Sequence, residues 1–110
     1  MDQETEKRLQ SALMSEWCDD GGFMHDLRYG KFNEEAYLRM RDIVAEIDFS
    51  GEERISKRLV SLFYRIPDWI AGHRDRVLEN GGSKILCDSV YAEVTTMVLE
   101  KFAEKDFAPD

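Results

Sequence analysis

The sequence has no long hydrophobic run, and it carries only two prolines, two cysteines and two histidines in 110 residues. No stretch approaches the roughly 20 consecutive apolar residues of a membrane-spanning helix, so we expect no contact with membranes. The first ten residues, MDQETEKRLQ, are acidic and polar, unlike a secretory signal or an amphipathic transit peptide. The sequence therefore predicts a cytoplasmic protein.

Cysteine and histidine also lack the spacing of a metal or catalytic site. Cys18 and Cys87 are far apart, so we expect two buried free thiols rather than a disulfide or a zinc site. His25 precedes Asp26, but adjacent residues are not expected to face each other on a helix. His73 lies on the apolar side of a predicted helix, where a core or boundary role is expected.

Catalytic motifs are absent from the sequence as well. There is no GxSxG, no phosphate-binding glycine loop and no metalloprotease helix, and the glycines stand where helix ends are expected. We therefore expect a protein that is not an enzyme and that uses no cofactor or metal. An enzyme built on His25 or His73 is the least favoured alternative.

The net charge of −8 is unevenly distributed along the chain. Residues 1–30, 31–53 and 85–110 each carry a net charge of −4, whereas residues 54–84 carry +4. Such an acidic surface repels nucleic acid and anionic membranes, and it accelerates encounter with a basic protein. An acidic surface that serves solubility alone is the plain alternative.

The positive segment resembles a nucleic-acid-binding patch, because aromatic residues stand among its basic ones: Arg54, Lys57, Arg58, Arg65, Arg74 and Arg76, with Tyr64 and Trp69. The pI of about 4.8 argues against nucleic acid as the partner, since such domains are usually basic. We expect these arginines to pair instead with carboxylates of neighbouring helices.

Apolar spacing predicts helices throughout, and no segment alternates as a strand would. A first helix is expected over residues 3–18, followed by a single turn or ordered loop within residues 23–32. Asn33 is the expected N-cap of a helix over residues 34–47. Ser83 is the expected N-cap of a last helix over residues 84–104.

Between these lies a central segment, residues 54–82, with the densest apolar run of the chain. Ser50 and Glu53 have the spacing of a capping box at its start. Pro67 is expected to end or kink the first of its two helices, and Gly81 and Gly82 to stop the second. The fold class predicted is all-α, an irregular bundle of about five helices in a single domain spanning residues 1–110.

Residues 58–82, RLVSLFYRIPDWIAGHRDRVLENGG, resemble small bacterial immunity proteins of contact-dependent growth inhibition and related polymorphic toxin systems. The resemblance covers about a quarter of the chain. It consists of an Arg-Leu-Val start, an aromatic, Ile-Pro, and an aromatic-containing helix ending in Arg-Val-x-Glu-x-Gly-Gly, here Arg58, Leu59, Val60, Phe63, Tyr64, Ile66, Pro67, Trp69, Arg76, Val77, Glu79, Gly81 and Gly82. It implies one-to-one binding of a cognate toxin domain and neutralisation by blocking the active site of the toxin.

A basic toxin domain, such as a nuclease that binds phosphates, would meet exposed carboxylates on this protein. The predicted partner-binding residues are Glu35, Asp42 and Glu46 on the helix over residues 34–47, with Asp48, Glu52 and Glu53 in the turn that follows. Three carboxylates of the early loop are the second choice: Asp19, Asp20 and Asp26. A small acidic regulatory or adaptor protein that binds a host enzyme or transcription component is the alternative function.

Overall fold

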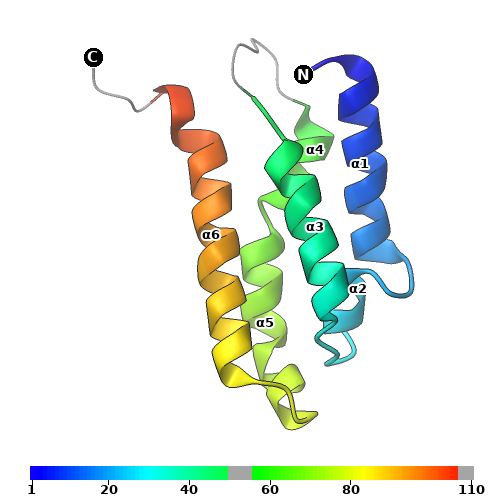
Figure 1. Cartoon of the computed structure of the whole chain (residues 1–110), viewed down its shortest axis with the longest axis vertical. Helices are drawn as coiled ribbons and strands as arrows, with labels where there is room; N and C mark the ends of the chain where they lie inside the picture. Colours follow the sequence, from blue (N-terminus) through cyan, green and yellow to red (C-terminus); the bar gives the residue numbers. More distant parts are fainter. Residues whose placement is uncertain (50–55, 107–110) are drawn as a thin grey trace.

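The computed structural model describes residues 1–49 and 56–106, and within them it contains six α-helices and no strand (Figure 1). The helices are α1 (Gln3–Cys18), α2 (Phe23–Leu27), α3 (Glu34–Glu46), α4 (Lys57–Phe63), α5 (Ile66–Glu79) and α6 (Lys84–Asp106). The all-α prediction is confirmed. The count is six rather than about five because the turn expected within residues 23–32 forms α2, a helix of five residues.

Two N-caps follow the prediction. The side chain of Asn33 accepts a hydrogen bond from the amide of Ala36 at 3.1 Å, and the hydroxyl of Ser83 accepts one from the amide of Leu86 at 3.1 Å. Each bond satisfies one of the amides that a helix leaves unpaired at its start.

The capping box predicted at Ser50 and Glu53 lies outside the residues that the structure describes. Helix α4 begins at Lys57, and its N-cap is Ser56, whose hydroxyl accepts from the amide of Leu59 at 3.1 Å.

Pro67 separates two helices, as predicted. Helix α4 ends at Phe63, and Pro67 stands in the first turn of α5, where a missing amide costs little. The break leaves carbonyl groups at the end of α4 without intrahelical donors. The indole of Trp17 on α1 donates to one of them, the carbonyl of Leu62, at 2.6 Å.

Helix α5 ends in a Schellman motif. Gly81 has a φ of +87°, a left-handed conformation that glycine adopts without strain. The amide of Gly82 donates to the carbonyl of Val77 at 2.9 Å, and the amide of Gly81 donates to the carbonyl of Leu78 at 3.0 Å. The predicted stop at these two glycines is confirmed.

One hydrophobic core joins all six helices. Helix α1 packs on α2, α3 and α4, whereas α6 packs mainly on α5 and touches α3 at few positions (Figure 1). The largest fully buried side chains are Phe23, Phe63, Leu9, Leu13, Met24, Leu27, Met40, Ile47, Leu59, Ile66, Ile70 and Val44. None of the helices described here is both long and apolar enough to cross a lipid bilayer.

The two cysteines differ in their surroundings. Both are free thiols; Cys87 is buried in the core, and this burial raises the pKa of its thiol. Cys18 is exposed, so the prediction that it is buried is wrong. It is the last residue of α1, and its spacing from Leu9 and Leu13 places it on the opposite side of that helix from these core residues.

Candidate functional site

The outer face of α3 carries two carboxylates that make no ion pair with any residue the structure describes. Glu35 and Asp42 are both exposed there. Leu38 lies three residues after Glu35 and four before Asp42, which places it between them on the same face, with 47% of its surface exposed. This arrangement, an exposed aliphatic side chain flanked by carboxylates, suits contact with a basic protein surface.

Glu46 is exposed on the same helix, but it has a partner inside the molecule. Its carboxylate accepts from the guanidinium of Arg8 on α1 at 3.2 and 3.3 Å, and this hydrogen bond raises the pKa of Arg8. Glu46 therefore joins α1 to α3 and presents less net charge to a partner than Glu35 or Asp42.

Three other predicted carboxylates follow α3, and the described residues include only one of them. Asp48 is exposed in the segment that follows α3. Glu52 and Glu53 lie outside the described residues.

Of the second-choice carboxylates, two are exposed. Asp19 follows α1 directly, and its amide donates to the carbonyl of Ser15 at 3.0 Å. The side chain of Asp20 is fully exposed, and its carboxylate lies 3.6 Å from Nε2 of His25. Both carboxylates are accessible to a partner.

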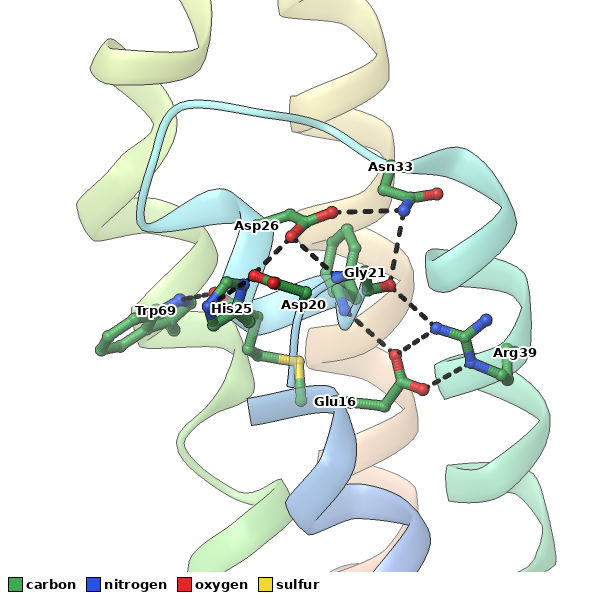
Figure 2. A network of polar contacts seen from close by, with 10 residues as sticks. Glu16, Asp20, Gly21, His25, Asp26, Asn33, Arg39 and Trp69 are labelled. Atoms are coloured by element: carbon green, nitrogen blue, oxygen red, sulfur yellow. Dashed lines mark hydrogen bonds and ion pairs between the residues drawn. The ribbon is translucent and has the colours of Figure 1, made fainter. Parts of the chain in front are cut away.

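Asp26 is buried, so the expectation that it is one of the exposed carboxylates is wrong. Only 7% of its surface is exposed, and its carboxylate accepts from the amide of Gly21 at 3.2 Å and from the side chain of Asn33 at 3.3 Å (Figure 2). Its other contact is with Nδ1 of His25, 3.1 Å away. Burial alone would raise the pKa of Asp26, but these hydrogen bonds outweigh it and hold the pKa below its ordinary value.

The contact between His25 and Asp26 also contradicts the expectation that these neighbours do not meet. Helix α2 is a single turn, and the carboxylate of Asp26 folds back over its start toward Gly21. The imidazole of His25 lies over the same turn and reaches that carboxylate (Figure 2). The resulting network holds the loop between α1 and α2 in place.

Glu16 is a buried carboxylate that the sequence reasoning missed. Its side chain is 4% exposed and accepts from Nε of Arg39 at 2.6 Å, from Nη2 of Arg39 at 3.0 Å and from the amide of Phe23 at 3.0 Å (Figure 2). Its spacing after Leu9 and Leu13 places it on the buried face of α1, and this signal could have identified it. Arg39 also donates to the carbonyl of Gly21 at 2.9 Å, so the pair fixes the same loop.

The basic residues of the central segment behave in two ways. Arg74 pairs with Asp88 of α6 at 2.8 Å, as predicted. Arg58, Arg65 and Arg76 are exposed, and none of them pairs with a carboxylate in the described part of the chain, so the prediction is wrong for these three. Arg54 lies outside the described residues. For Arg58 the reason is the neighbouring surface of α1, where the hollow beside it is lined by Lys7, Gln10, Ser11, Met14 and Ser15 and by no acid.

Neither metal ligands nor similar proteins point to a function for this chain. Among the side chains that the structure describes, no three histidine, cysteine or carboxylate groups are placed together as a metal site would require. Comparison with known proteins gives no match to any family model, to any curated protein or to any solved structure.

Proposed function

We propose that this chain is an immunity protein that binds a cognate bacterial toxin domain in the cytoplasm and blocks its active site. The toxin domain is basic, as a nuclease is, and the immunity protein contributes no catalysis of its own. The observation that carries the proposal is the outer face of α3, where Glu35 and Asp42 flank the exposed side chain of Leu38 without an internal ion pair.

The contrast with the contact between α1 and α3 supports this choice. There the carboxylates of Glu16 and Glu46 are matched by Arg39 and Arg8. Unmatched carboxylates on a folded surface cost stability through mutual repulsion, and a basic partner removes that cost on binding. They also raise the association rate, which matters when a toxin must be captured before it acts.

The proposal predicts that a gene for a large toxin lies immediately upstream, and it is tested with the C-terminal domain of that gene's product in a catalytically inactive form. The wild-type chain is expected to bind it one to one and to protect cells that produce the active domain. The double variant Glu35→Lys/Asp42→Lys is expected to associate at least about tenfold more slowly at low salt, with a weaker dependence on salt.

The matched control for each single variant, Glu35→Lys or Asp42→Lys, is Asp75→Lys on α5, which makes the same change of charge at a side chain that is 90% exposed. It is expected to slow association much less than either single α3 variant. Failure of the wild-type chain to bind or to protect would reject the immunity function, and capture of a host enzyme instead would favour the regulatory alternative.

A further inference from the structure

A small hollow lies between the first halves of α3 and α6. Its volume is about 200 Å³, below the roughly 300–1,000 Å³ of pockets that hold small molecules and cofactors, so it has room for a single side chain. The two helices run in the same direction in Figure 1 and touch at few positions, which leaves the space between them. The hollow is lined by Phe32, Glu34, Tyr37, Leu38, Leu86, Ser89, Val90 and Glu93.

Exposed apolar side chains gather at this hollow. Leu38 lines the hollow on its α3 side and is 47% exposed, and Ile85, which does not line it, is 84% exposed and lies one turn before the lining residue Ser89 on α6. Phe32 also lines a second hollow of about 350 Å³, where Tyr29 is 62% exposed. Leu38 and Ile85 thus stand at one hollow and Tyr29 at the second. Single exposed apolar residues are ordinary on protein surfaces, but exposed apolar residues beside concavities are typical of an interaction site.

The walls of the hollow are held rigidly. The hydroxyl of Tyr37 donates to the carboxylate of Glu93 at 2.6 Å, and Arg41 pairs with the same carboxylate at 3.3 Å. Burial raises the pKa of Tyr37, and its bond to Glu93 raises it further. The ring of Phe32 packs edge-on against Phe23, with centroids 5.4 Å apart. A site formed in advance loses less conformational entropy on binding.

The rim of the hollow is acidic. Among the described residues its lining includes two carboxylates, Glu34 and Glu93, and no basic side chain. The carboxylate of Glu93 is matched by Arg41, whereas Glu34 pairs with no described residue. Glu35 and Asp42 flank Leu38 on the adjoining face of α3, so the charge around the hollow is complementary to a basic partner.

We infer that this hollow receives one aliphatic or aromatic side chain of the toxin domain, flanked on the toxin by lysine or arginine residues that reach Glu34, Glu35 and Asp42. The inference rests on the proposed function, and it assigns the energy of toxin binding to the hollow between α3 and α6. Carboxylates guide the approach, while burial of the apolar side chain against Phe32, Leu38 and Leu86 slows dissociation.

The experiment compares Leu38→Asp and Ile85→Asp with the wild-type chain in binding to the inactive toxin domain. Leu38→Asp is expected to weaken binding about 30-fold, mostly through faster dissociation, because it places a charge in the apolar contact. Ile85→Asp is expected to act in the same direction. The control is Leu99→Asp on α6, which alters a leucine that is 63% exposed and does not line the hollow.

The outcomes separate the inference from the proposed function. If the wild-type chain binds and Leu38→Asp dissociates no faster than Leu99→Asp, the inference is overturned and the immunity function stands. If the wild-type chain does not bind at all, both are overturned. A wild-type dimer in sedimentation that Leu38→Asp converts to monomer would also overturn the inference, because a second copy would then occupy the hollow.

Discussion

Two ion pairs join α1 to α3, and their different burial predicts different energies. Arg39 and Glu16 form the inner pair, in which the carboxylate side chain is 4% exposed. Arg8 and Glu46 form the outer pair, in which the side chains are 57% and 52% exposed. The charged groups and the helices are the same. The pairs differ in burial and in two further bonds of the inner pair, from Arg39 to the carbonyl of Gly21 and from the amide of Phe23 to Glu16.

Arg39→Met leaves the buried carboxylate of Glu16 with one donor, the amide of Phe23. Removing one member of a fully buried pair costs about 3–5 kcal/mol. The side chain of Arg39 is 54% exposed, so water can replace part of the lost interaction, and we expect a loss of about 2–3 kcal/mol in the free energy of unfolding. The outer variant Arg8→Met is expected to leave stability unchanged within error, because exposed pairs contribute little.

The measurement is urea unfolding followed by the fluorescence of Trp17 and Trp69. The variants Glu16→Gln, Arg39→Met and the double variant complete a cycle, with an expected coupling of about 1–2 kcal/mol. The same cycle on Arg8 and Glu46 is the control. Equal coupling at the two pairs would refute the reasoning that burial sets the energy.

Three further predictions concern stability. In urea unfolding, Trp69→Ala is expected to cost about 3 kcal/mol and Trp69→Phe about 1 kcal/mol. Both variants remove the 2.8 Å hydrogen bond to the carbonyl of Met24, but only Trp69→Ala also removes the packing of the ring. An unchanged unfolding midpoint for Trp69→Ala would contradict this prediction. Asp26→Asn is expected to destabilise most near neutral pH. The fold holds the pKa of Asp26 below its ordinary value of 3.8, so the ionised carboxylate stabilises the protein above pH 3.8, and this stabilisation is lost as the pH falls through the pKa of the folded state. A difference in stability from wild type that does not shrink in acid would count against this prediction. Gly22→Ala is expected to destabilise by about 1–3 kcal/mol, since a Cβ there would lie 2.6 Å from two carbonyl oxygens of α1, whereas Gly72→Ala, with open space, should be neutral or stabilising by thermal unfolding.

Local signals in the sequence were sufficient to predict where the long helices lie. Apolar spacing located α1, α3 and α6, Asn33 and Ser83 marked two helix starts, and Pro67 marked the break between α4 and α5. These features act within one or two turns of a helix, so they do not depend on which element lies opposite.

The surroundings of individual charges could not be predicted in the same way. Asp26 is buried because Gly21 and Asn33 come near it in the fold, and no spacing in the sequence shows that approach. Arg58 pairs with no carboxylate among the described residues, because α1 presents none toward it. Whether a charge is matched depends on the facing helix, and helical spacing specifies only which side of its own helix a residue occupies. The partner and the immunity function remain predictions.

The buried face of α6 is built from three valines and Cys87. Val90, Val94 and Val98 lie in the core, and Thr95 and Thr96 add two more β-branched residues to the same helix. Such residues favour extended chain over helix, so contact with α5 and α3 is what keeps α6 helical. Undocking and unwinding of α6 should therefore be a single event, and its amides should exchange with deuterium at one common free energy of opening. A toxin side chain held between α3 and α6 would then slow exchange along the whole of α6, far beyond the residues it touches.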